Sequence, residues 1–259
     1  MKSDRVLTPV SIDLDNLWAY LRTRGDPGWI SFPDFLDVAI PRALDFFSEL
    51  NVTATFCVVG RDAECAALQN LMGEITAAGH EIGNHSYDHR IDIHRWSKSE
   101  IRDDFDRSEA AIGAATGATP VGFRGPSFRI SDEVRRELIR RDYRYDSSIF
   151  PTVVGPLARA VHFSASTLSA DQKTQQKDLF GKFSDGFQPL RPHQWRSLEG
   201  TLLEIPVTTF PFLRLPVHMT YIHFIADQSE TLAAHYFRLA VRTCSTSLNI
   251  ARIRKAKPL

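Results

Sequence analysis

Short apolar runs alternate with longer amphipathic stretches along this chain of 259 residues. Compact apolar and β-branched runs indicate buried strands, whereas apolar residues that recur every three or four positions indicate helices. The runs predict strands at residues 6–14, 53–59, 81–83, 122–124, 144–145 and 201–208. The recurring positions predict helices at residues 33–50, 63–78, 97–116, 131–141 and 228–243. This alternation predicts an α/β fold with a parallel sheet, either doubly wound or closed into a β/α barrel.

The length of the chain suits one large α/β domain or, at most, two small ones. Residues 155–195 follow neither the strand nor the helix period clearly. Their polar part, residues 169–177, is either a helix or an insertion that lies over the functional site. We therefore expect one catalytic domain over residues 1–259, with residues 155–195 inserted above its site.

Composition and charge narrow the class of protein. Apolar residues make up 43% of the chain and charged residues 24%, which is typical of a soluble globular domain. The 31 basic residues are balanced by 31 acidic residues, so the formal net charge is zero and no nucleic-acid partner is expected. The basic residues in 252–257 could form a local basic patch, but a solvated tail explains them equally well.

The cysteines and the start of the chain predict a cytoplasmic location. Cys57, Cys65 and Cys244 form no C-x-x-C pair and cannot build a closed disulfide framework. Unpaired thiols suit a reducing compartment. The first residues lack the apolar stretch of a secretory signal, and no run approaches the roughly 18 apolar residues of a membrane span.

Charged side chains and a histidine stand at the predicted carboxyl ends of several strands. Asp13 and Asp15 end the first strand, His85 follows the third, and Arg124 ends the fourth. In parallel α/β sheets, ligands and catalytic groups gather at this edge. The sequence therefore predicts a functional site there.

His85 and His89 are four residues apart, so on a helical turn their imidazoles would share one face and could bind one ion. Zinc accepts imidazole nitrogen and carboxylate oxygen, and a catalytic zinc site has three protein ligands with one open position. Either Asp13 or Asp15 could supply the third ligand. Taken alone, the spacing is equally that of two surface histidines after a turn.

Asp13 and Asp15 would lie on the same face of a strand, because side chains alternate along it. One could bind the metal while the other acts as general base on the activated water. An Asp-rich turn that caps the following segment is the alternative. Arg124 could orient the base through a charge-assisted hydrogen bond, or it could be a surface arginine before the Pro126 turn.

Five segments together resemble the polysaccharide deacetylases, the NodB homology group also called carbohydrate esterase family 4. They are SIDLDN at 11–16, TATFCVVG at 53–60, GHEIGNHSYDH at 79–89, GFRGPSF at 122–128 and YRYDSSIFP at 143–151. Each segment is short, but their order matches that of the family over roughly residues 6–211.

The resemblance implies a deformed (β/α) barrel that binds a divalent metal, usually zinc. By position, the metal ligands would be Asp15, His85 and His89, the general base Asp13, its partner Arg124, and the oxyanion donor the backbone N–H of Ser127 after Pro126. The implied activity is metal-dependent hydrolysis of an N-acyl group, acetyl above all, from a sugar or polysaccharide. An N-acylated carbohydrate is therefore the expected partner, and the sequence leaves the oligomeric state open.

The chain departs from the family near its C-terminus. The family has a late Leu-x-His motif on its last strand, whereas residues 246–254 contain no histidine, which predicts an incomplete closing strand. His218 or His223 could replace the missing general acid, or both could be structural. Three hypotheses follow: an N-deacetylase, a catalytically impaired sugar-binding relative, and an amide hydrolase acting on a small substrate that is not a sugar.

Overall fold

The computed structural model describes residues 9–32 and 34–246. Within those residues the strands form one sheet in the order β1-β2-β3-β4-β5-β7-β6. Their bounds are β1 (Ser11–Leu14), β2 (Thr55–Val58), β3 (Glu81–Asn84), β4 (Gly122–Phe123), β5 (Tyr145–Asp146), β6 (His193–Ser197) and β7 (Gly200–Glu204). All neighbours are parallel except β6, which runs antiparallel to β7. The predicted α/β fold with a parallel sheet is confirmed.

In this order, β1 and β6 are the first and last strands. The resemblance implies that the sheet curves into a deformed barrel with an incomplete closing strand at residues 246–254. Almost all of that segment lies outside the described residues. The incomplete closure therefore stays a prediction.

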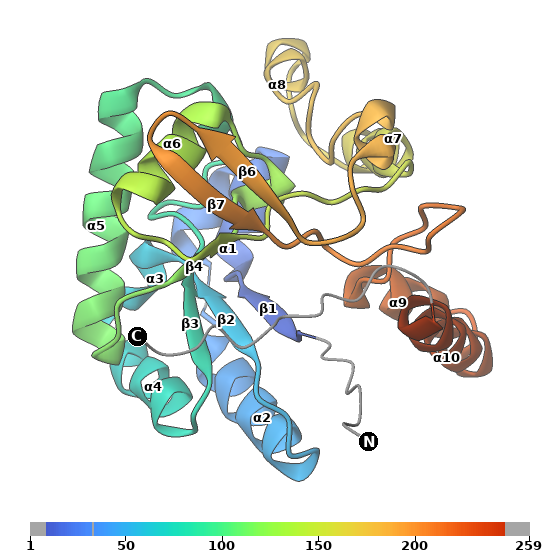
Figure 1. Cartoon of the computed structure of the whole chain (residues 1–259), viewed down its shortest axis with the longest axis horizontal. Coiled ribbons are helices and arrows are strands. Elements are labelled where there is room, and N and C mark those ends of the chain that lie inside the picture. The colour runs from blue at the N-terminus through green and yellow to red at the C-terminus, as the bar shows by residue number, and fades with distance from the viewer. Residues whose placement is uncertain (1–8, 33, 247–259) are drawn as a thin grey trace.

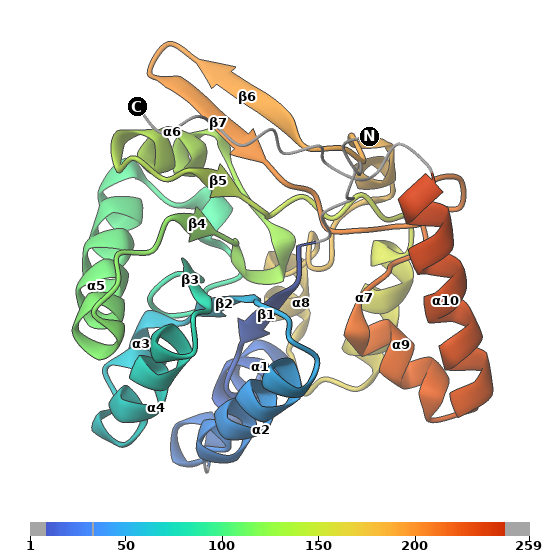
Figure 2. The same cartoon turned by 60° about the horizontal axis from the view of Figure 1, so that its bottom comes forward.

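Helices surround the sheet, with α5 and α10 on opposite flanks in both views (Figures 1 and 2). No described helix is both long and apolar enough to cross a membrane. The helices are α1 (Leu17–Arg24), α2 (Leu36–Glu49), α3 (Gly60–Ala63), α4 (Ala66–Ala77), α5 (Lys98–Thr116), α6 (Asp132–Arg140), α7 (Gly155–Ser164), α8 (Ala170–Gln175), α9 (Met219–Ala226) and α10 (Glu230–Thr246).

The main core lies between strands β1 to β3 and helices α2, α4 and α5. Ile40 of α2, Phe56 of β2 and Met72 of α4 are completely buried in it. Burying such a side chain contributes about 1.5–3 kcal/mol to the free energy of unfolding. The packing against these helices therefore fixes the positions of the first strands. At the N-terminus of α5, Ser97 and Glu100 form the predicted capping box.

The segment 155–195 contains α7, α8 and a short 3-10 helix at Phe183–Phe187. It is fixed to α1 because the side-chain amide of Gln176 donates to the carbonyl of Thr23 at 2.9 Å. Arg95, in the loop that follows β3, donates to the carbonyl of Gln175 at 2.9 Å. The end of α8 therefore stands beside the loop that carries His85 and His89.

Candidate active site

The register of the parallel strands brings the sequence-predicted residues together. Leu14 lies opposite Val58, Val58 opposite Asn84, and Asn84 opposite Phe123. The residues one step further along β1, β3 and β4 are Asp15, His85 and Arg124, so these three emerge at one edge of the sheet. Strand order and register thus gather residues that are up to 109 positions apart in the sequence.

Asp15 lies between the two histidines. Its carboxylate oxygens are 3.3 Å from Nε2 of His85 and 3.4 Å from Nε2 of His89. The three ligand atoms all lie within 4.8 Å of one another, and this is the one metal-type cluster among the described residues. Burial by itself would raise the pKa of Asp15, but the facing imidazoles of His89 and His85 hold that pKa well below its usual range. One ionised carboxylate and two imidazoles form the donor set that zinc prefers in catalytic sites.

The orientation of His85 fixes which ring nitrogen is available. Its Nδ1 lies 2.6 Å from the carbonyl oxygen of Arg124, and that oxygen can only accept, so Nδ1 carries the proton. The lone pair of a neutral ring is then on Nε2, which faces Asp15. A backbone carbonyl in this role is the usual outer partner of a metal-binding histidine.

His89 reaches the site by a turn and not by the helical turn that its spacing suggested. The segment after β3 is irregular, and Ser86 and His89 both adopt left-handed backbone conformations, with φ of 65° and 45°. The backbone N–H of Ser86 donates to the side chain of Asn84, and that of Tyr87 donates to the side chain of Asp104. The expectation of a helical turn was wrong, although the convergence of the two imidazoles that it was meant to explain is present.

The loop is fixed from its outer side by Asp88. This carboxylate forms ion pairs with Arg22 of α1 at 2.8 Å and with Arg61 of α3 at 2.5 Å. Arg22 also donates to the backbone carbonyls of Asp88 and His89. Because non-glycine residues seldom take left-handed conformations without support, these bonds hold His89 in its unusual geometry.

Asp13 forms an ion pair with Arg124, whose Nη1 is 2.7 Å from Oδ1 of the carboxylate. The guanidinium is buried and is fixed by further bonds to the hydroxyls of Ser11 and Ser147 and to the carbonyl of Ser147. Asp13 thus has one defined orientation beside Asp15. This is the arrangement that the sequence predicted for a general base and its partner.

The turn Gly125-Pro126-Ser127 follows Arg124. Gly125 has no room for a side chain, because a Cβ there would collide with the carbonyl of Arg129. Its N–H donates to the hydroxyl of Ser148 at 2.7 Å. Ser127 adopts a left-handed conformation with φ of 55°, so the turn that carries the predicted oxyanion donor has a defined and unusual shape.

Beneath this turn lies a pair of buried carboxyls that sequence reasoning missed. Asp146 and Glu204 are register partners at the ends of β5 and β7, and both are buried. The hydroxyl of Ser148 donates to Asp146 at 2.5 Å. Burial, and then the neighbouring Asp146 charge, raise the pKa of Glu204 well above its usual range, so this carboxyl keeps its proton where an exposed one would ionise. The available signals were Glu204 inside the predicted apolar strand at 201–208 and Asp146 directly after the predicted strand at 144–145.

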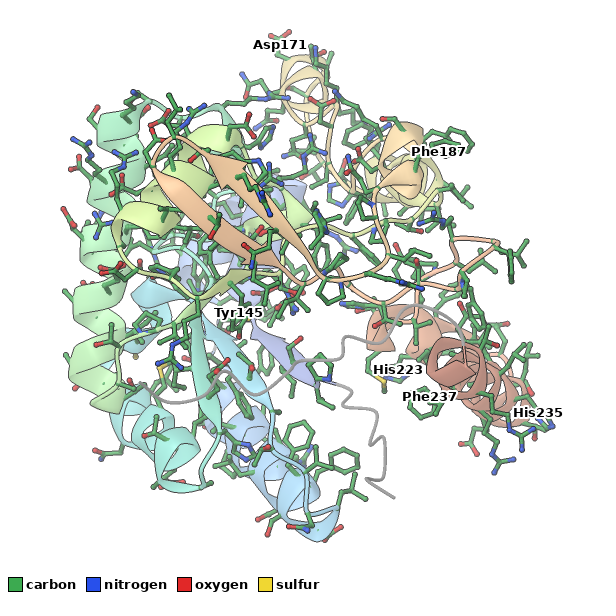
Figure 3. The ribbon with its side chains drawn as sticks, viewed as in Figure 1. Tyr145, Asp171, Phe187, His223, His235 and Phe237 are labelled. Atoms are coloured by element: carbon green, nitrogen blue, oxygen red, sulfur yellow. The ribbon has the colours of Figure 1, made fainter. Side chains whose placement is uncertain are left out.

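The two candidate acids lie in different surroundings. His218, at the start of α9, packs against the rings of Phe128 and Phe150 at centroid distances of 5.7 and 5.8 Å. Burial lowers its pKa, and the charges of Asp13 and Arg124 are close enough to act on that pKa as well. By contrast, the His223 side chain is 80% exposed, and Figure 3 shows it on the outer helix α9. The structure therefore brings His218, and not His223, to the site.

Tyr20 of α1 is a second neighbour of the site that the sequence did not reveal. Its hydroxyl donates to Oδ2 of Asp15 at 3.1 Å. Nothing in the short segment around Tyr20 distinguishes it from a packing aromatic. Its contact depends on α1 turning back toward β1.

Comparisons with known proteins point to the polysaccharide deacetylases. Residues 22–145 match the polysaccharide deacetylase family model, a range that includes His85, His89 and Arg124 and begins after Asp13 and Asp15. A peptidoglycan deacetylase from Helicobacter pylori is 29% identical over 209 residues, which cover 79% of this chain and 66% of that protein. A peptidoglycan-N-acetylglucosamine deacetylase from Bacillus cereus is 32% identical over 98 residues, which cover 38% of this chain and 34% of that protein.

Among solved structures, the fold resembles that of a Mycobacterium smegmatis protein assigned to the polysaccharide deacetylases. The TM-score is 0.57 at 19% identity, covering 87% of this chain and 72% of the other. At that identity the likeness concerns the fold alone. The chain spans about two thirds of the H. pylori relative and a third of the B. cereus one. The family match and these relatives confirm the predicted resemblance to the polysaccharide deacetylases.

Proposed function

We propose that this chain is a divalent-metal-dependent N-deacetylase that hydrolyses the acetamide of an amino sugar within a glycan. The observation that carries the proposal is the convergence of two units at one sheet edge. The first unit is Asp15 with His85 and His89, whose ligand atoms lie within 4.8 Å of one another. The second is Asp13, fixed by Arg124 at 2.7 Å. Without the first unit the site would have a base but no metal. Without the second it would have a metal but no base.

The three ligand side chains fit a divalent ion, with zinc as the proposed metal. Their donor set, the proton on Nδ1 of His85 and the ionised Asp15 all suit such an ion. The ion would supply Lewis-acid chemistry, which activates water and polarises an acyl carbonyl.

Asp13 is the proposed proton acceptor. Its Oδ1 is engaged by Arg124, which leaves Oδ2 to take the proton from water as the water attacks the acyl carbon. Arg124 holds the carboxylate in one orientation, and a positioned base of this kind contributes about 10²- to 10⁴-fold to a rate. The contacts with Ser11 and Ser147 keep the guanidinium from following Asp13 into other rotamers.

The N–H of Ser127 is the proposed donor to the oxyanion that develops on the acyl oxygen. Preorganised donors are often the largest single catalytic effect, because they need no rearrangement as charge appears. The hydrogen bonds from Gly125 to Ser148 and from Ser148 to Asp146 hold this turn in place.

His218 is the proposed donor of the proton that the departing amine needs. Its Nδ1 accepts from the N–H of Thr220 at 3.3 Å, so the exchangeable proton of the neutral ring is on Nε2. Burial lowers the pKa of His218, which keeps the imidazolium scarce near neutral pH but makes it a strong acid once formed. We therefore expect a modest contribution at the lower end of the usual range for general acids.

The proposed substrate class comes from the relatives, which are peptidoglycan deacetylases by name. Acetate release from N-acetylglucosamine oligomers should be measured with the purified chain after chelation and after addition of zinc. We expect turnover with zinc and at least about 100-fold less without it. Small cyclic amides should be tested in parallel. Turnover of those alone, or none with metal bound, would contradict the sugar deacetylase proposal.

Replacing His218 with glutamine should lower kcat by about 10²-fold, because the leaving amine loses its proton donor. His223→Gln is the matched control, since His223 lies on the same helix but is exposed. It should change kcat by less than about twofold. Metal content should stay the same in both variants. Equal kcat values for the two variants would remove His218 from the reaction.

A further inference from the structure

A pocket opens beside the ligand cluster and is lined in part by His89. It has a volume of about 210 Å³ and is lined by the end of α1, the loop after His89, Arg129 and the residues around the end of α8. Figure 3 shows α8, marked by Asp171 at its outer end, standing above the body of the molecule. A group bound in this pocket would therefore be next to the metal-type cluster and covered on one side by the segment 155–195.

The pocket is rich in arginine, and each of its arginines forms an ion pair with a carboxylate. Four arginines line it against two carboxylates, Asp92 and Asp178. Burial, and then the charges of Arg129 and Arg95, lower the pKa of His94 in the same wall to about 4. His94 is therefore neutral, mainly because it is buried and secondarily because two guanidiniums lie nearby.

Two of the four arginines are committed elsewhere. Arg22 is engaged by Asp88 and by two backbone carbonyls of the ligand loop. Arg90 is bound by both oxygens of Asp92 at the exposed rim. These two arginines stabilise the loop or the rim and have few donors left for another group.

Arg129 and Arg95 have donors to spare. A guanidinium carries five N–H groups. Arg129 makes one ion pair, to Asp185 at 3.2 Å, and its Nε is buried without a hydrogen-bond partner in the described structure. Arg95 donates once to Asp178 and once to the carbonyl of Gln175. A buried donor that lacks a partner is destabilising unless a ligand satisfies it.

We propose that this pocket binds an anionic substituent of the glycan, a carboxylate or a phosphate, through Arg129 and Arg95. The inference rests on the proposed function, because it places the anion on the same substrate whose N-acetyl group reaches the metal cluster. The planar fork of arginine binds both kinds of anion in a bidentate manner. The substrate would then be a charged glycan, and neutral oligomers would be poorer substrates.

The test compares two oligosaccharides of equal length on the zinc-loaded chain, one neutral and one with a carboxylate on the sugar next to the N-acetylglucosamine. We expect kcat/KM about 10- to 100-fold higher for the anionic one, mainly through KM, as a charged hydrogen bond would give. Arg129→Gln should abolish this preference while leaving the neutral substrate within about twofold. Arg129→Lys, which keeps the charge, should restore part of it.

Arg135→Gln is the matched control. Arg135 also makes one ion pair, to Asp132 at 3.1 Å, and its side chain is 14% exposed against 17% for Arg129. This variant should retain the full preference. Equal kcat/KM for the two oligosaccharides in the unmodified chain, or a preference that survives Arg129→Gln, would overturn the inference.

Binding separates this inference from the proposed function. Affinities of both oligosaccharides should be measured by calorimetry on the zinc-loaded chain and on Arg129→Gln. Tighter binding of the anionic oligosaccharide, lost in the variant, supports the pocket even if neither sugar is hydrolysed. Inorganic phosphate serves as the free-anion probe. If Arg129→Gln weakens the binding of phosphate but not that of the anionic oligosaccharide, the pocket takes free anions and the glycan proposal is wrong.

Discussion

Asp13→Asn should lower kcat for acetate release by about 10²- to 10⁴-fold and leave zinc binding intact. The substitution preserves the size of the side chain and an oxygen that can accept from Arg124, but it removes the capacity to take a proton. Asp13 is bound to Arg124 and lies outside the cluster of ligand atoms. Elemental analysis and acetate release on the same preparation measure the two properties together.

The matched control is Asp15→Asn, two residues further along the chain and chemically the same change. Asp15 belongs to the ligand cluster, so this variant should lose both the metal and the activity. The two variants should therefore differ in metal content although both are inactive. If Asp13→Asn also lost the metal, Asp13 would be a ligand, and if it kept full activity, another group would be the base.

His85→Ala should reduce bound zinc from about one ion per chain to near zero and reduce deacetylation to background. A catalytic zinc site has only three protein ligands, so the loss of one leaves two weak donors. Even changes to the partners of such ligands weaken metal binding by about 10- to 100-fold, and loss of a ligand should exceed that. Metal content after dialysis against zinc of known concentration provides the measurement.

His80→Ala distinguishes loss of a ligand from loss of a buried histidine. His80 is also buried, and its Nδ1 accepts from the backbone N–H of Ala54 at 3.1 Å. This variant should unfold at a lower temperature but keep its zinc. A chain that binds one zinc ion after His85→Ala would show that the cluster is not the metal site.

The central strands and the helices that pack on them could be predicted from the sequence. A strand such as Thr55–Val58 is covered on both faces, so it consists almost entirely of apolar residues and stands out from its surroundings. The amphipathic helix α2 also stands out, because its apolar residues recur with the helical period. Because the carboxyl ends of parallel strands meet at one edge, the side chains that follow them could be assigned to one site before any contact was known.

The elements that were missed carry little pattern. Helix α1 is eight residues long and mixes arginines with aromatics, and α9 is apolar on nearly every side, so neither shows a period. Strand β6, HQWRS, is largely polar because it ends the sheet. Because α1 was not predicted, the contact of Tyr20 with Asp15 could not be predicted. Because α9 was not predicted, neither could the surroundings of His218.

Details of the site depended on backbone geometry and on long-range pairing. The left-handed conformation of His89 is unusual for a residue with a side chain, and periodicity does not indicate it. Asp13 and Arg124 are 111 residues apart, and their places at strand ends, together with the family resemblance, linked them. The carboxyl pair of Asp146 and Glu204 depends on β5 lying next to β7, which skips a strand in the chain order.

Arg124 touches both halves of the site through chemically independent groups: its main-chain oxygen holds the ring of His85, and its guanidinium holds Asp13. The side chain at this position can therefore change over evolutionary time without turning the His85 ring, because any residue supplies a carbonyl. A shift of β4 as a whole has the opposite consequence. Such a shift would displace the partners of His85 and Asp13 together.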